Sequence, residues 1–394
     1  MKIARIETLQ AEAGYRTACY VKLTTDDGLT GWSEYYDGLG GAELAPLIAG
    51  FARTATGMDP RNVGLISESL LATARLAAGG LAHQAVAAIE NACLDVHGKA
   101  LGVPVYQLFG GPFRRSVPVY WTHCGSFRVR HAAFYASLGY EPVRTLADFT
   151  RLGREAVDLG FTALKTNAVF FEPGGPVMMS GGFRIAPGFL DRSITEPQIS
   201  AIVAQLEAFR AGVGPDFGLM LDVGFSQRTE GFLRLARRLE PLNMYWLEID
   251  TPDAGALALI RQKSNVPIAS LESLYGLAQY RPFLAERAAD IAIIDPVWNG
   301  VWQSVRIATV AEAFETHIAP HNPAGDLATL MSAHFCAAVT NVRIMEYRAD
   351  EAPWTHEFLT HPPMMQDGAI VVPDRPGWGS DIDEDALRAH PVPG

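Results

Sequence analysis

The chain has 394 residues, of which 48% are hydrophobic and 19% charged, and its 43 acidic against 32 basic side chains leave a formal charge of −11. This length allows two or three domains, or one large barrel with an appendage. The acidic balance excludes a general nucleic-acid binder, which needs a basic face to release counterions from phosphates. The large apolar fraction excludes a disordered chain, because enough surface can be buried to offset the entropy of ordering.

The N-terminal stretch MKIARIETLQ alternates apolar and polar residues, as a strand does. It lacks the apolar stretch and the small-residue cleavage site of a signal peptide, and no window of the chain reaches the roughly 18 apolar residues of a spanning helix. Cys19, Cys93, Cys124 and Cys336 have no metal-type spacing and suggest no disulfide framework. We therefore expect a cytoplasmic protein with mostly buried free thiols, no membrane and no nucleic-acid partner.

The first third of the chain predicts a small α+β unit over residues 1–115. Residues 1–35 contain two or three strands, with a hairpin at the turn signal Asp26-Asp27-Gly28. From Gly41 to about Leu108 the pattern is helical, and the Ala-rich stretch AHQAVAAIENACLDVHGKALG ends near Gly102.

After Pro112 short apolar runs recur, most of them followed by a segment of helical pattern. Eight such strands alternating with helices, and apolar on both faces, predict an α/β fold of the (β/α)8 barrel type over residues 116–355 rather than an open sheet. The runs are VPVYWTHC (117–124), FTALKTN (161–167), GLMLDVG (218–224), MYWLEI (244–249), PIASLES (267–273), IAIIDPV (291–297), THIAPHN (316–322) and VRIMEY (342–347).

Two segments depart from this rhythm. Residues 168–194 form a long stretch rich in Gly, Pro, Met and Phe, and a loop of that length is usually functional or disordered. We expect a lid over the active site there, with an oligomer contact as the alternative. Residues 356–394 are rich in Pro, Gly and acidic residues, and we expect them to pack back on the N-terminal unit.

Most of the predicted barrel strands end in a side chain that can carry chemistry. From Asp222 onward these residues are separated by steps of 26, 24, 23, 26 and 25 residues, one βα unit each. A single strand-end Asp is more often a helix cap, but repetition at the face where barrel active sites lie favours function. The residues are Lys165, Asp222, Glu248, Glu272, Asp295, His321 and Glu346.

Asp222, Glu248 and Glu272 end three consecutive strands, so their carboxylates should converge. Like charges this close raise one another's pKa unless a cation offsets them. Oxygen ligands without Cys or His suit Mg2+, and we predict one Mg2+ per subunit. Such a metal would bind a substrate carboxylate and stabilise the enediolate left after loss of the α-proton.

Asp295 and His321 end the next two strands. A carboxylate on one ring nitrogen fixes the tautomer and raises the basicity of the other, which makes His321 a candidate general base rather than a structural loop histidine. Lys165, in a largely apolar run, is a candidate second proton-transfer group or a cation for the substrate carboxylate, with an ordinary surface lysine as the alternative. His123 closes the first strand, where it either contacts substrate or is structural.

These residues resemble the enolase superfamily and, within it, the mandelate racemase subgroup. The resemblance covers nearly the whole chain, including ENACLDVHGKALGVPVYQLFGG at the junction and VVPDRPGWGSDIDED near the end. It implies an N-terminal capping domain, completed by the C-terminal segment, over a barrel. It also implies that Asp222, Glu248 and Glu272 bind Mg2+, that His321 and Asp295 form the subgroup's dyad, and that Glu346 bonds the substrate carboxylate or enediolate. The stretch APHNPAGDLATLMSAHFCAAV is similar to acid-sugar dehydratases such as galactonate dehydratase.

Three departures from the family pattern bear on the reaction. The Lys-x-Lys of the racemases is Lys165-Thr166-Asn167, and galactonate dehydratase-like members also carry Asn there, so the second lysine of a racemase is missing. Gly224 occupies the place where galactonate dehydratases have their histidine acid. The usual Glu-Glu-Pro is replaced by LEIDTPD.

We therefore predict a Mg2+-dependent hydro-lyase that dehydrates a sugar acid to a 2-keto-3-deoxy acid. The metal and Lys165 would hold the carboxylate, and His321 would transfer the α-proton. One alternative is a racemase, epimerase or cycloisomerase that uses the same enolate, and another is a non-catalytic sensing protein that keeps the metal site. Substrate contacts are expected from Glu346, Asn167, His123, Tyr15 and Arg16. The resemblance further implies a homo-oligomer.

Overall fold

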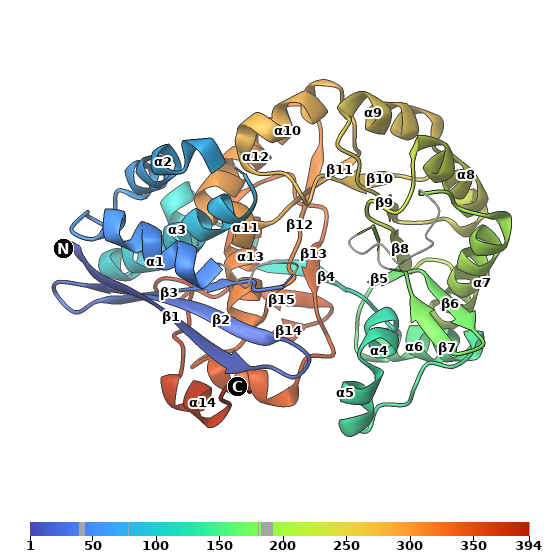
Figure 1. Cartoon of the computed structure of the whole chain (residues 1–394), viewed down its shortest axis with the longest axis horizontal. Helices are drawn as coiled ribbons and strands as arrows, with labels where there is room; N and C mark the ends of the chain where they lie inside the picture. Colours follow the sequence, from blue (N-terminus) through green and yellow to red (C-terminus); the bar gives the residue numbers. More distant parts are fainter. Residues whose placement is uncertain (39–43, 78, 180, 183–191, 394) are drawn as a thin grey trace.

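The computed structural model describes residues 1–38, 44–77, 79–179, 181–182 and 192–393. Figure 1 shows two parts, an N-terminal cap and a barrel, with both chain termini on the side of the cap. The predicted α/β barrel with an N-terminal α+β cap is therefore confirmed. The boundaries drawn at residues 115 and 355 stay a prediction.

The cap is an antiparallel sheet covered by helices. Its strands β1, β2 and β3 lie in that order, and the Asp26–Gly28 turn joins the second to the third. The long helix α3 packs on β3 and ends at Gly102, whose left-handed φ of +71° closes the helix as the sequence predicted. The elements are β1 (Ile3–Glu12), β2 (Thr17–Thr25), β3 (Thr30–Tyr35), α1 (Leu44–Ala55), α2 (Val63–Thr73), α3 (Gly80–Leu101) and the 3-10 helices at Arg75–Ala77 and Val105–Phe109.

Eight parallel strands form the barrel. They are ordered β4, β5, β8, β9, β10, β11 and β12, and β13 pairs with β4 to bring the last strand beside the first. A parallel bridge between Ile318 and Val342 links the chain of β12 to the segment before β13. The strands are β4 (Ser116–Trp121), β5 (Ala163–Asn167), β8 (Gly218–Asp222), β9 (Trp246–Glu248), β10 (Ile268–Ser270), β11 (Ile291–Ile294), β12 (His317–Pro320) and β13 (Met345–Tyr347).

The interior of the barrel is a small apolar cluster separate from the large core between strands and helices. Side chains alternate along a strand, so every second residue points inward. The inward-facing residues are Tyr120, Ala163, Met220, Trp246, Ala269, Ile291, Ile293, Ala319 and Ile344. This packed floor leaves the next inward positions, at the strand ends, for the chemistry-bearing side chains.

Helices follow the strands and form the outer layer seen around the right-hand side of Figure 1. One connection differs: after β5 the chain forms the antiparallel hairpin of β6 (Val169–Glu172) and β7 (Gly175–Met178). The helices are α4 (Ser126–Arg130), α5 (Ala132–Ser137), α6 (Leu146–Asp158), α7 (Glu196–Val213), α8 (Thr229–Leu239), α9 (Ala254–Lys263), α10 (Gly276–Ala285), α11 (Pro296–Asn299), α12 (Val301–Ala313), α13 (Asp326–Ala338) and a 3-10 turn at Glu240–Leu242.

The C-terminal segment returns to both parts. It contains a 3-10 helix (Pro353–Phe358), β14 (Met365–Gln366), β15 (Ala369–Val371), which pairs with β4, and α14 (Glu384–Ala389). Trp378 is fully buried and donates its indole N–H to the Trp32 carbonyl at 2.9 Å. Buried Asp95 on α3 accepts from the backbone N–H groups of both tryptophans, so one carboxylate joins the cap sheet to the C-terminal segment.

All four cysteines are buried and free, as the sequence predicted. Within the described ranges, no helix combines the length and the apolar character needed to cross a lipid bilayer.

Candidate active site

A cavity of about 1000 Å³ lies at the carboxyl ends of the barrel strands and is also lined by residues of the cap. Nine of the eleven predicted site residues line it, and the other two, Glu248 and Asp295, lie buried just behind its wall. The structure therefore gathers in one place residues that lie more than 300 positions apart in the chain. The nine are Tyr15, Arg16, His123, Lys165, Asn167, Asp222, Glu272, His321 and Glu346.

His321 and Asp295 form a hydrogen-bonded pair. His321 Nδ1 lies 2.8 Å from Asp295 Oδ2, so the N–H at Nδ1 donates to the carboxylate and Nε2 is left for proton transfer. Asp295 also accepts at Oδ1 from the backbone N–H groups of Val297 and Trp298, and so it caps α11 as well. Burial alone would lower the pKa of His321, but the carboxylates of Glu272, Glu346 and Asp295 raise it to about 10.

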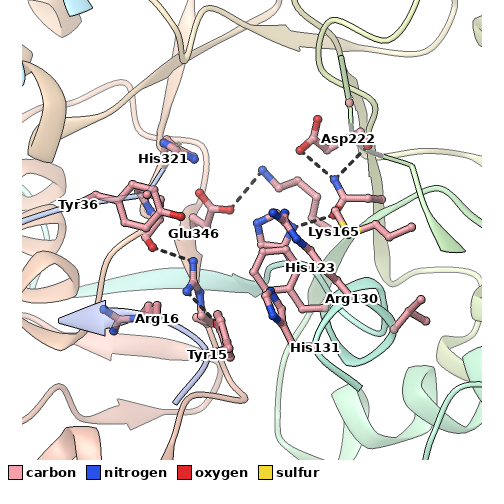
Figure 2. A pocket seen from close by; sticks show the side chains of 18 of the residues that line it. Tyr15, Arg16, Tyr36, His123, Arg130, His131, Lys165, Asp222, His321 and Glu346 are labelled. Carbon is pink, nitrogen blue, oxygen red and sulfur yellow. Dashed lines mark hydrogen bonds and ion pairs between the residues drawn. The ribbon is translucent and has the colours of Figure 1, made fainter. Parts of the chain in front are cut away.

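Lys165 is held as an ion between two carboxylates. Its Nζ lies 3.0 Å from Glu248 Oε2 and 3.3 Å from Glu346 Oε1, and the side chain is 2% exposed. Burial opposes its charge, yet Glu248 and Glu346 together raise the pKa of Lys165 well above its ordinary value. Figure 2 shows Lys165 and Glu346 facing each other across the cavity floor. The ammonium is thus fixed where a substrate carboxylate can approach it.

Glu346 is fixed from three sides. Besides Lys165, it accepts from the Thr122 hydroxyl and, at 2.8 Å, from the backbone N–H of Asn322. Burial raises its pKa, but Lys165 and His321 outweigh burial and hold the pKa well below the usual range. Glu346 is therefore an ionised acceptor rather than a proton donor.

The three predicted metal ligands end adjacent strands. Asp222 and Glu248 are register partners on β8 and β9, and Glu272 follows β10 after Leu271, whose left-handed φ of +92° turns the chain. Burial is the first cause that raises the pKa of each of the three, and neighbouring carboxylates raise them further. A buried group of acids with one lysine among them has the chemistry of a site that accepts a divalent cation.

The three carboxylates are not drawn together into one tight cluster. In the part of the chain that the structure describes, no three His, Cys, Asp or Glu side chains are close enough together to form a metal-binding group. Glu248 is engaged by Lys165 and by the Trp246 indole N–H, and Asp222 accepts from Asn167 Nδ2 and from the Gly224 N–H. The donor chemistry fits Mg2+, but the cation must compete with these contacts.

The cap supplies the opposite wall through the β1–β2 loop. Tyr15 Oη accepts from Arg348 Nη1 at 2.9 Å, and Arg16 Nε donates to Glu351 Oε2 at 3.1 Å. Arg16 also lies 3.6 Å from Glu34, a buried acid of β3 that accepts from two backbone N–H groups at the start of α13. Figure 2 shows Tyr15, Arg16 and Tyr36 on the side of the cavity that faces Lys165.

The predicted lid lies partly outside the described residues, which omit 180 and 183–191. In the described part, Pro176, Val177 and Met178 of β7, together with Met179 and Gly181, line the cavity. The segment after β5 therefore contributes apolar wall to the site. Whether it opens and closes stays a hypothesis.

Several residues of the site were not predicted from the sequence. Arg348 lines the cavity and could have been found from its position two residues beyond Glu346, because alternate residues of an extended chain point to the same face. Asp250, two residues beyond Glu248, is buried, and burial followed by Glu248 raises its pKa to about 6. Trp298 stands edge-on to His321 with ring centres 4.9 Å apart. Arg130 and His131 follow the first barrel strand, and no spacing pointed to them.

Two family models match the chain. Residues 7–110 match "Mandelate racemase / muconate lactonizing enzyme, N-terminal domain", and residues 148–386 match "Enolase C-terminal domain-like". Among curated relatives, D-xylonate dehydratase of Haloferax volcanii is 28% identical over all of this chain and 90% of its own length. D-galactonate dehydratase of Pectobacterium atrosepticum is 27% identical over 98% of this chain and 94% of its own length.

Among solved structures, a Burkholderia xenovorans protein described as a candidate L-alanine-DL-glutamate epimerase is 39% identical, with a TM-score of 0.95 over 99% of this chain and 98% of that one. A second structure of the same description, bound to magnesium and fumarate, has a TM-score of 0.94, with 39% identity over 99% of this chain and 96% of that one. The names of the similar proteins thus divide between dehydratases and an epimerase.

Proposed function

Because this chain belongs to the mandelate racemase/muconate lactonizing enzyme family of the enolase superfamily, we propose that it is a Mg2+-dependent dehydratase of a sugar acid. The named dehydratases among its relatives and the position of the His321–Asp295 pair beside a cavity of ionised groups support this reaction class. The product is a 2-keto-3-deoxy acid.

We assign the metal to Asp222, Glu248 and Glu272, where its chemistry would be to polarise the substrate carboxylate and stabilise the charge of the enediolate. The ammonium of Lys165, already fixed between Glu248 and Glu346, binds the same carboxylate. Glu346, ionised, orients Lys165 and accepts from the substrate.

His321 takes the α-proton at Nε2, while Asp295 holds Nδ1–H and stabilises the imidazolium that forms. The β-hydroxyl leaves as water with the proton that the His321 imidazolium returns, and the resulting enol tautomerises to the 2-keto acid. The strand β8 offers no side chain as the acid, because Gly224 contributes only its backbone N–H, which donates to Asp222 at 2.9 Å.

One observation favours dehydration over racemisation. A racemase needs bases on both faces of the α-carbon, and Lys165 is the second candidate here. Its ammonium is paired with two buried carboxylates, which favours the charged form, and its racemase partner position holds Asn167. Mg2+ bound at Glu272 would offset one of the carboxylates that raise the pKa of His321, so we assign the α-proton to His321 rather than to Lys165.

The reaction is tested by incubating the Mg2+-loaded protein with a panel of acid sugars, including D-xylonate, D-galactonate and D-mannonate, and trapping the 2-keto acid with semicarbazide. Parallel reactions in D2O report on the enolate. We expect 2-keto acid formation from at least one panel member. Deuterium at the α-carbon of recovered substrate without water loss would instead establish the epimerase alternative. That alternative agrees with the description of the Burkholderia xenovorans neighbour.

A further inference from the structure

The amide of Asn167 has one orientation, fixed by what surrounds it. On one side it faces the backbone carbonyl of Asp222 at 3.3 Å and Asp222 Oδ2 at 3.2 Å. Both of these atoms accept hydrogen bonds, so the group that faces them must be the NH2 of the amide. The amide oxygen of Asn167 consequently points the other way, toward Ser126 Oγ at 2.9 Å and the ring of His123.

This orientation determines the tautomer of His123. Its Nδ1 lies 2.7 Å from Asn167 Oδ1, and a carbonyl oxygen can only accept. The proton of the neutral imidazole is therefore on Nδ1, and Nε2 carries a lone pair. In the described residues no hydrogen-bond partner is found for Nε2, and the ring lines the cavity beside Lys165.

The ring is also held mechanically. His123 stacks on Phe127 with ring centres 3.8 Å apart and planes 7° from parallel. Its backbone has a φ of +51°, in the left-handed region that residues with a Cβ rarely adopt. Strain of this kind persists where the surroundings fix a conformation, and here it directs the imidazole from the end of β4 into the cavity.

The charge around His123 selects what can donate to it. Burial is the main cause that lowers the pKa of His123 to about 3; Glu346 opposes this shift, and the cations Arg348 and Lys165 add to it. Neutral Nε2 is thus an acceptor in a cavity that is also lined by Lys165, Arg130 and Arg348. Arg348 and Lys165 act on the His123 ring and would repel an ammonium group placed beside it, whereas a substrate hydroxyl can donate to Nε2 without that repulsion.

We propose that His123 is a specificity-determining residue that accepts a hydrogen bond at Nε2 from a substrate hydroxyl, and that Asn167 is the residue that positions it. The site then favours polyhydroxy acids over amino acids and over acids that lack the hydroxyl. This inference rests on the proposed function, since it names the substrate class of the same cavity. It also explains why an amide, rather than a second lysine, occupies position 167.

The tautomer is tested by 15N NMR of the Mg2+-loaded full chain with labelled histidine, with His123 assigned by its loss in His123→Phe. We expect a neutral ring with the proton on Nδ1 between pH 6 and pH 8. In Asn167→Leu, which has no acceptor at this place, the protonation pattern of His123 should change. A proton on Nε2, or a cationic ring in the wild type, overturns the proposal whatever the enzyme turns over.

The selectivity is tested by calorimetric binding of D-galactonate, its monodeoxy analogues and 2-amino-2-deoxy-D-galactonate. The wild type should bind D-galactonate about tenfold or more tightly than the amino analogue and than one of the deoxy analogues. His123→Phe, which keeps the stacking on Phe127 but removes the acceptor, should abolish this preference. The control His317→Phe removes an exposed imidazole at the start of β12, outside the cavity lining, and should leave the preference intact.

The proposal is contradicted if the wild type binds D-galactonate and 2-amino-2-deoxy-D-galactonate equally well, or does not bind D-galactonate at all. It is also contradicted if His123→Phe keeps the full preference of the wild type. If the preference depends on His123 but no acid sugar is dehydrated, the proposed reaction is wrong while the hydroxyl-reading role of His123 stands.

Discussion

The two walls of the cavity are built differently. The barrel wall consists of strand ends, where Lys165, Glu248 and Glu346 are almost completely buried and the Lys165 ammonium pairs with both carboxylates. The cap wall consists of the β1–β2 loop, where Tyr15 and Arg16 are partly exposed and are held by Arg348 and Glu351. We infer that the strand ends carry the chemistry and the recognition of one hydroxyl by His123, which need fixed positions, and that the loop carries the recognition that varies between substrates.

The largest expected effect on activity belongs to the barrel wall, where His321 is the proposed base. His321→Asn keeps a polar side chain beside Asp295 but cannot take a proton at Nε2, so kcat should fall about a hundredfold to ten-thousandfold with little change in KM. Steady-state kinetics on the substrate found in the acid-sugar panel measures the effect, with a thermal melt as the folding control. A variant as active as the wild type would remove His321 from the mechanism.

Metal binding should stabilise the barrel wall and leave the cap wall unchanged. Mg2+ at 100 times its Kd is expected to add about 2.7 kcal/mol to the free energy of unfolding, which a shift in Tm reports. Asp222→Asn should lose most of this shift while remaining as stable as the wild type in EDTA, because burial already disfavours the charge of Asp222. The matched control Asp253→Asn alters an exposed helix cap and should keep the full shift. A wild type whose Tm ignores Mg2+ would refute the site.

On the cap wall, Tyr15→Phe removes the hydroxyl that accepts from Arg348 and leaves the ring stacked on His131. One lost hydrogen bond of about 1 kcal/mol should raise KM about fivefold and leave kcat nearly unchanged. The effect should be larger for long sugar acids than for short ones, since their distal ends reach this wall. A fall in kcat with KM unchanged would place Tyr15 in the chemical step and contradict the assignment of recognition to the cap wall.

The smallest expected effect is on the free energy of unfolding, and it concerns Glu90 of α3, which lies between the cap and the barrel. This buried acid accepts from the Ser67 hydroxyl and from backbone N–H groups of α12, and burial raises its pKa from 4.5 to about 7. A raised pKa means that the folded state binds the proton more tightly, so this contribution to stability is present at low pH and is lost as the pH rises from about 4.5 through about 7.

Glu90→Gln should therefore be more stable than the wild type above pH 7 by of order 1 kcal/mol, and the difference should shrink toward pH 5. Denaturant unfolding at several pH values measures it. A variant that is less stable than the wild type at pH 8 would mean that the ionised carboxylate is required at this contact, and that Glu90 holds the cap to the barrel through its charge.

The barrel could be predicted because its signal is local. Each apolar run and the helix after it form one βα unit, and the regular steps from Asp222 to Glu346 place these residues at equivalent strand ends. All eight predicted strands are present, and the dyad of His321 and Asp295 is hydrogen-bonded as proposed. Asp295 shows that two interpretations of one residue can both hold, because it caps α11 and bonds His321 at once.

The cap wall was harder to predict because its contacts cross the whole chain. Arg16 meets Glu351, 335 positions away, and Tyr15 meets Arg348 across 333 positions. No periodicity in the sequence encodes such pairs, since each is created by the way the cap docks on the barrel mouth. Arg130 and His131 lie in the segment after β4 and had no recognisable spacing.

By itself, the sequence determined the (β/α)8 barrel, the cap and the chemical type of the strand-end side chains, because these depend on hydrophobic period and on one residue type at each unit. The tertiary structure decided which atoms meet: that Lys165 is held between Glu248 and Glu346, and that Asn167 joins Asp222 to His123. Protonation states, tautomers and free lone pairs are set by neighbours within about 3 Å of one another, and only the folded chain brings those neighbours together.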